Sequence, residues 1–139
     1  MFSIFDVASM GMSAQSIRLN TIASNMANAS NVSGDINEVY RSIHPEFLSV
    51  NMQDTDDFGN NSGLVGVQVT KISHDSLAPQ KKYDPYHPSA DPDGYVYVSN
   101  VNIMQEMADM ISASRTYQTN VQILNSTKDA LLQTINLGK

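Results

Sequence analysis

Residues 103–137 read IMQEMADMISASRTYQTNVQILNSTKDALLQTINL and contain neither glycine nor proline. Mostly apolar residues recur in this segment at alternating steps of three and four, the spacing of a coiled-coil seam. The repeat comprises Ile103, Met107, Met110, Ser114, Tyr117, Val121, Leu124, Lys128, Leu131 and Ile135. We expect one long helix that begins near Asn100 or Asn102 and ends near Leu137, with Gly138 as a suitable stop.

The N-terminal segment repeats the same spacing. Its members are Phe5, Ala8, Met12, Gln15, Leu19, Ile22, Met26 and Ala29. Ser3 followed by Asp6 resembles a capping box, so a helix is expected from there to about Ala29. Two such helices bury too little surface by themselves, which favours assembly with other chains. An ordinary pair of helices packed on a globular core explains the periodicity equally well.

The segment between the two helices differs in charge and in pattern. Residues 31–99 hold ten acidic and four basic residues, which accounts for the whole net charge of −6. Short strands are expected at 65–69 and 95–98, and an extended run before Pro45. The sequence therefore predicts a mainly α chain. Residues 1–30 plus 100–139 would form a discontinuous helical inner domain, and residues 31–99 a β or irregular outer segment.

Several classes of function find no support in these 139 residues. There is no cysteine for thiolate chemistry or a cysteine-based zinc site, and no basic cluster for nucleic acid. Asp54, Asp56 and Gly59 match half of a calcium loop, but Val65 stands where a bidentate glutamate is needed, so a solvated turn is favoured. The chain is predicted to be no enzyme and to bind no metal or cofactor.

Another cluster of possible ligands lies further along the chain. Asp84, His87, Asp91 and Asp93 gather within ten residues, but prolines separate them in a turn-rich stretch. A structural role is favoured over a metal site for this cluster. A small hydrolase with its site near His87 and Asp91 is the weakest hypothesis, because no nucleophile or oxyanion hole is recognisable.

Three segments resemble a known family. Residues 23–30, ASNMANAS, resemble a signature shared by flagellar axial proteins of rod, hook and filament-junction type. Residues 84–96, DPYHPSADPDGYV, resemble a stretch characteristic of the proximal rod protein family FlgC. Residues 100–121, including Glu106-Met107 and the run from Met110 to Val121, resemble the same family. Residues 31–38 and 51–63 depart from its pattern.

The resemblance implies a structural subunit of the proximal rod of the bacterial flagellar basal body, at the periplasm or cell wall. Such subunits form a helical tube that transmits torque and belongs to the export channel. The implied partners are further copies, the rod proteins FlgB, FlgF and FlgG, the rod-base protein FliE and the flagellar type III export apparatus. Export by that route uses no cleaved signal, and no removable secretory signal is expected at the N-terminus.

The heptads and the resemblance together predict an assembly interface on both helices. Its residues are Phe5, Met12, Leu19, Ile22, Asn25, Met26, Asn28, Met107, Met110, Tyr117, Val121, Leu124 and Leu131. A soluble coiled-coil adaptor or export chaperone is the alternative function. An adaptor would be well folded and dimeric by itself, which distinguishes it from a subunit that completes its packing on assembly.

Overall fold

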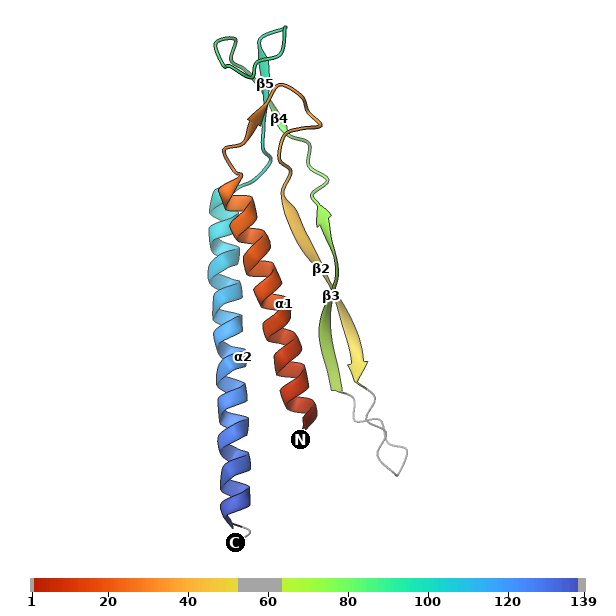
Figure 1. Cartoon of the computed structure of the whole chain (residues 1–139), viewed down its shortest axis with the longest axis vertical. Helices are drawn as coiled ribbons and strands as arrows, with labels where there is room; N and C mark the ends of the chain where they lie inside the picture. Colours follow the sequence, from red (N-terminus) through yellow and green to blue (C-terminus); the bar gives the residue numbers. More distant parts are fainter. Residues whose placement is uncertain (1, 53–63, 138–139) are drawn as a thin grey trace.

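The computed structural model describes residues 2–52 and 64–137. The elements are α1 (Phe2–Ala27), β1 (Val32–Ser33), β2 (Ile43–Met52), β3 (Leu64–His74), β4 (Gln80–Tyr83), β5 (Tyr95–Val98) and α2 (Ile103–Leu137). The two helices lie side by side and antiparallel (Figure 1). The β2–β3 hairpin runs along another side of α1, so α1 lies between the hairpin and α2 (Figure 1).

The prediction of a mainly α chain is wrong. Helices account for about 48% of the described residues, and about 25% lie in strands of two antiparallel sheets. The difference comes largely from β2 and β3, which have 10 and 11 residues and pair along their whole length. Pro45 does not end β2, because an unpaired strand edge tolerates the missing N–H group. The middle segment is thus a long hairpin plus a small sheet.

The ends of the helices follow ordinary capping chemistry. Asn102 caps α2, since its Oδ1 accepts hydrogen bonds from the backbone N–H groups of Met104 (3.1 Å) and Gln105 (3.4 Å). At the same end of the pair, α1 closes in turns over residues 28–31, where the backbone N–H of Asn28 bonds to the carbonyl of Ser24 at 3.1 Å (Figure 1). α2 is longer than α1, and its C-terminal part extends beyond the N-terminus of α1 (Figure 1).

The second sheet lies at the far end of the molecule, in the order β1-β5-β4 (Figure 1). The loop between β4 and β5 folds back on itself through backbone hydrogen bonds, and Gly94 takes the left-handed conformation there with φ of 79°. The loop packs against Gly34, where a Cβ atom would lie 2.6 Å from the carbonyl oxygen of Ser89. Only glycine permits that close approach.

The buried core consists mainly of small side chains. Its apolar members are Ala8, Ala14, Ile22, Ala29, Val39, Val96 and Ala113. Alanine lets the two helices approach closely but buries little apolar surface. Among the described residues, no helix combines the length and the apolarity needed to span a membrane.

Candidate assembly surfaces and the polar joint

A buried asparagine joins three elements near the C-terminal end of α1. The side chain of Asn25 is fully buried and makes four hydrogen bonds. Its Nδ2 donates to the carbonyl of Ile43 (3.0 Å) and to Oε1 of Glu106 (2.9 Å). Its Oδ1 accepts from the N–H of Ile43 and the hydroxyl of Tyr40, both at 2.9 Å. One amide is therefore satisfied at every position and holds α1, β2 and α2 together.

We call Asn25, Tyr40, Ile43 and Glu106 the polar joint. Further hydrogen bonds secure its surroundings. Asn100 accepts from the N–H of Ser42 at 2.8 Å and donates to the carbonyl of Leu77 at 2.8 Å. Arg18 of α1 pairs with Asp109 of α2 at 2.7 Å, with both side chains about two-thirds buried. The relative position of the two helices is thus fixed by polar side chains.

Glu106 is the unusual member of the polar joint. The residue is 4% exposed, and its Oε2 is buried without a hydrogen-bond partner among the described residues. Burial raises the pKa of this carboxyl above its ordinary value, although the hydrogen bond from Asn25 and the nearby His44 oppose the shift. The ionised form of Glu106 is therefore disfavoured in the free chain.

This pKa shift predicts a pH dependence of stability. Because the folded-state pKa is raised, the stabilisation from Glu106 is complete below pH 4.5 and is lost as pH rises through the folded-state value. Glu106→Gln keeps an oxygen for Asn25 and removes the charge. We expect the variant to be at least as stable as wild type at pH 7, with less loss of stability between acid and neutral pH. Urea unfolding across pH 4–8 checks this, and a wild-type slope unchanged in the variant would contradict it.

The first turns of α2 carry apolar side chains on the face away from α1. Of the 35 residues of α2, only Glu106 and Ala113 are buried. Ile103, Met104, Met107 and Ile111 are all exposed, Met104 by 77% and Ile111 by 62%. Their spacing places them side by side on one stripe of the helix. We call these four residues the outer stripe, and its exposure is typical of a surface that other chains cover.

The predicted interface residues differ in burial. Ile22 and Asn25 are buried, and Met107 and Tyr117 are exposed. The half-buried ones are Phe5, Met12, Leu19, Met26, Asn28, Met110, Val121, Leu124 and Leu131. By helical periodicity, Leu124 and Leu131 share the side of α2 that carries Glu106 and Ala113, whereas Met107 lies on the outer stripe. The role of all these residues in assembly stays a prediction.

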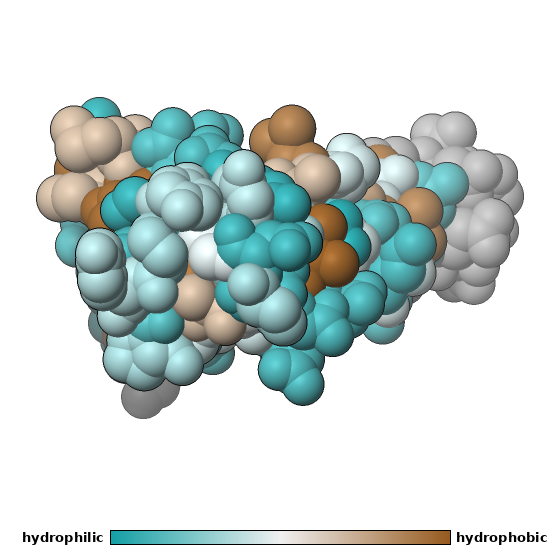
Figure 2. Space-filling model, turned by 90° about the horizontal axis from the view of Figure 1, so that it is seen from above, coloured by the Kyte–Doolittle hydropathy of each residue, from teal (hydrophilic) through white to brown (hydrophobic). Residues whose placement is uncertain are grey.

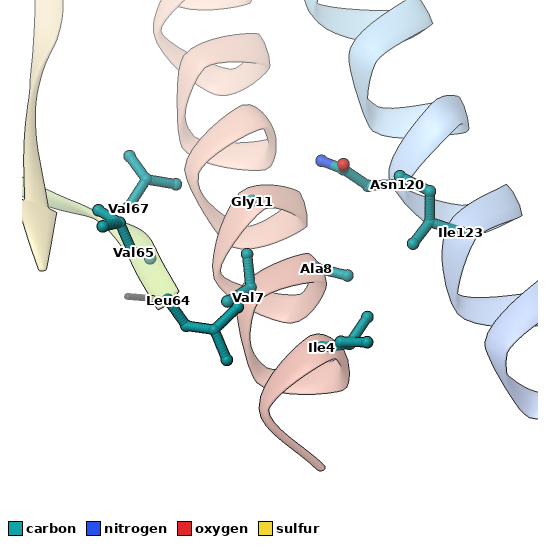
Figure 3. A pocket seen from close by; sticks show the side chains of 10 residues that line it. Ile4, Val7, Ala8, Gly11, Leu64, Val65, Val67, Asn120 and Ile123 are labelled. Atoms are coloured by element: carbon teal, nitrogen blue, oxygen red, sulfur yellow. The ribbon is translucent and has the colours of Figure 1, made fainter. Parts of the chain in front are cut away.

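An apolar groove of about 330 Å³ opens near the N-terminus of α1. Ile4, Val7 and Ala8 of α1 line it together with the start of β3 and with Asn120 and Ile123 of α2 (Figure 3). The side chains of Asn120 and Ile123 point from α2 toward α1 (Figure 3). No charged side chain contributes to this lining. Its chemistry suits a structural apolar contact.

Of the other candidate ligands identified in the sequence, some make hydrogen bonds within the β4–β5 loop and others lie outside the described residues. Asp54, Asp56 and Gly59 are outside the described residues. His87 accepts a hydrogen bond at Nδ1 from the N–H of Ser89 (3.1 Å), and Asp91 bonds through its backbone to Tyr95. Over the described ranges, no group of three or more His, Cys, Asp or Glu residues could hold a metal ion. Seen from the β4–β5 end, the surface is mostly hydrophilic (Figure 2).

Sequence reasoning missed Glu106 as a member of the polar joint and Asn100 as the residue that links Ser42 and Leu77 beside it. Periodicity searches rank apolar positions, and Glu106 is a charged residue on the most buried line of α2. The available signal was the seven-residue spacing that places Glu106 in line with Ala113 and Asn120, on a helix with few charges.

Two paired helices with an exposed apolar stripe and a β-containing middle are typical of a structural subunit that packs against other chains. Residues 5–34 match the model of the family described as Flagella basal body rod protein. Residues 93–137 match the model described as Flagellar basal body rod FlgEFG protein C-terminal.

Curated relatives named flagellar basal-body rod protein FlgC align with the whole chain. The relative from Yersinia enterocolitica is 42% identical over 139 residues, which is 100% of this chain and 98% of the relative. The relative from Salmonella typhimurium is 39% identical over 140 residues, with the same coverage of both chains. The relative from Buchnera aphidicola subsp. Schizaphis graminum is 37% identical, again over 100% and 98%.

The chain belongs to the FlgC family of flagellar basal-body rod proteins. It is a structural subunit of the rod of the bacterial flagellar basal body and acts in motility, and it is not an enzyme. The family resemblance inferred from residues 23–30, 84–96 and 100–121 is confirmed. As a rod protein it associates with other components of the rod.

Proposed function

We propose that this subunit polymerises within the proximal rod into a helical tube that transmits torque and lines part of the export channel. The observation that carries the proposal is the low burial of α2, which hides only two of its 35 residues within the subunit. In addition, the outer stripe exposes apolar side chains to water, which is unfavourable in free energy. Packing of this stripe against neighbouring helices would complete the burial.

We infer that the helices form the inner part of the tube and that residues 31–99 form its outer part. The charges support this division, because residues 31–99 carry the whole net charge of −6 and each helical segment is neutral. Neutral helices can crowd together without repulsion, and an acidic exterior keeps the surface hydrated. A head-to-tail interface that does not close on itself then generates a helical tube.

The finer partners follow from the same surfaces. We propose that α2 packs against helices of further copies and of FlgB, FlgF and FlgG, with FliE at the rod base, and that the flagellar type III apparatus exports the chain. The apolar and charge-poor outer stripe supports packing against equally charge-poor helices. The two residues of the stripe that protrude most, Met104 and Ile111, would contribute most of the buried area.

The proposal is tested by Ile111→Asp in cells that lack the wild-type copy. Ile111 is 62% exposed, so an aspartate there leaves the fold of the subunit intact while placing a charge in the proposed interface. We expect the loss of isolated rods and of swimming, with a normal amount of protein and an unchanged circular dichroism spectrum. Ile111→Leu, which conserves volume and polarity, is the matched control and should retain motility.

Normal rods in Ile111→Asp would contradict assembly through the outer stripe. The oligomeric state of the free chain distinguishes the adaptor from the rod subunit. A closed, cooperatively folded dimer at low concentration, unaffected by Ile111→Asp, would favour the adaptor. A monomer in analytical ultracentrifugation that loses only rod formation in the variant supports the rod subunit.

A further inference from the structure

A polar cleft lies beside the polar joint, where the N-terminal end of α2 meets β2 and the segment after β3. Its lining includes Ser42, His44, Asp75, Asn102, Gln105 and Glu106. Two carboxyl groups and several amide groups face this cleft, and histidine is its only basic side chain. The cleft is chemically suited to a group that donates several hydrogen bonds and carries positive charge.

The buried carboxyl of Glu106 provides an independent reason to expect such a group. Its Oε1 is satisfied by Asn25, but Oε2 is buried and has no partner among the described residues. A buried carboxylate oxygen without a donor is costly, and most buried polar atoms in proteins are hydrogen-bonded. The described part of the subunit therefore leaves one carboxyl oxygen at the cleft without a hydrogen-bond partner.

A second copy of this chain could supply such a donor from one of its own basic residues. Basic residues that already have a partner within the subunit are less suitable. Arg18 pairs with Asp109, Lys71 lies 3.4 Å from Glu46, and Arg41 donates to the carbonyl of Asp75. Lys81 lies over the ring of Tyr95, 4.1 Å from its centroid. Within the described ranges, Lys82, Arg115 and Lys128 remain without such a partner.

Of these three residues, Arg115 is the most suitable donor to Glu106 of another copy, because of its guanidinium group and its place on α2. A guanidinium presents a planar set of donors that matches a carboxylate, which a lysine ammonium does not. Arg115 is exposed on α2, nine residues after Glu106. Nine residues are about two and a half helical turns, so Arg115 and Glu106 lie on opposite faces of the same helix. Lys128 lies about six turns after Glu106 and thus near its side of the helix, and Lys82 belongs to β4.

We propose that the cleft beside Glu106 receives the guanidinium of Arg115 from a second copy of this chain. Donor and acceptor on opposite faces of one helix produce a head-to-tail contact that repeats from copy to copy, which builds a helical assembly when the rotation between copies does not close a ring. In this contact, the buried carboxyl of Glu106 gains its second hydrogen-bond partner only in the assembled state. Docking in the correct position therefore stabilises the polar joint. The inference rests on the proposed polymerisation and identifies one pair of residues within it.

A double-mutant cycle tests this pair in full-length chains expressed without the wild-type copy. The variants are Arg115→Gln, Glu106→Gln and both together, with Lys128→Gln and Lys82→Gln as matched controls. We expect each single change at the pair to reduce the number of isolated rods about tenfold, and the double change to be no worse than either single one. The controls should assemble as wild type. Circular dichroism of each free chain monitors folding.

Cross-linking provides a second readout that leaves Arg115 and Glu106 intact. The chain has no cysteine, so Gln105→Cys at the rim of the cleft and Thr119→Cys, one turn after Arg115, can be placed on separate copies. We expect a short bis-maleimide to join the two copies in rods and not in the free chains. Additive single effects, normal rods in Arg115→Gln, an equal defect in Lys128→Gln, or no cross-link in intact rods would overturn the inference. In each case loss of rods in Ile111→Asp would still uphold the proposed function.

Discussion

Asn25→Ala is expected to lower the free energy of unfolding by about 3–5 kcal/mol, a large share of the stability of a small domain. The change removes four hydrogen bonds and leaves the backbone N–H and carbonyl of Ile43 without their partner. It also leaves Oε1 of Glu106 without a donor. Each buried group without a partner costs about 1–3 kcal/mol, and alanine offers no substitute.

Thermal and urea unfolding followed by circular dichroism measure this effect. Asn20→Ala is the matched control, because Asn20 is exposed on the same helix and should change stability by less than about 0.5 kcal/mol. Asn25→Asp adds information, since it keeps the acceptor for Tyr40 and Ile43 but places a carboxylate beside Glu106. Equal stability of Asn25→Ala and Asn20→Ala would show that the polar joint contributes nothing.

Leu124→Asp is expected to abolish rod assembly and motility while expression stays normal. Leu124 is half-buried and lies five helical turns after Glu106, on the same side of α2. A carboxylate there loses the apolar contact and must be desolvated where the two helices meet, which costs about 3 kcal/mol or more. Separation of the helices in this half of the molecule would also disturb the groove lined by Ile4 and Ile123.

Rod counts by electron microscopy and swimming assays check this prediction. Leu124→Met conserves volume and should cost less than about 1.5 kcal/mol, so its rods should be normal. Hydrogen exchange in the free Leu124→Asp chain should show faster exchange in the half of α2 that follows residue 120. Normal rods in Leu124→Asp would exclude Leu124 from the assembly seam.

The helices were largely predictable because their signals are local. The expected spans, Ser3 to about Ala29 and Asn100 or Asn102 to Leu137, lie close to Phe2–Ala27 and Ile103–Leu137. The strand at 95–98 coincides with β5. The length of the β2–β3 hairpin was not predictable, because Pro45 reads as a strand end and pairing across residues 53–63 is a long-range property.

The face of α2 that packs within the subunit was harder to predict than the helix itself. The three-four repeat selects Ile103 and Met107, which are exposed, whereas the buried residues are Glu106 and Ala113. At the start of α2, a small side chain and a hydrogen-bonded carboxyl give close packing within the subunit, and the larger apolar residues Ile103 and Met107 remain outside. Hydrophobic periodicity therefore reports the sum of contacts inside and outside the subunit and cannot separate them.

The strand edges of the long hairpin determine how readily copies of this chain could aggregate by pairing their strands. β2 and β3 form a sheet of two strands, so each presents one unpaired edge that could recruit a strand from another molecule. Pro45 removes a donor from β2, the register shifts between Glu46 and Phe47, and Lys71 places a charge on β3. Such features discourage edge-to-edge aggregation. The polymerisation proposed for this chain is thus kept apart from amyloid-like stacking through strand edges.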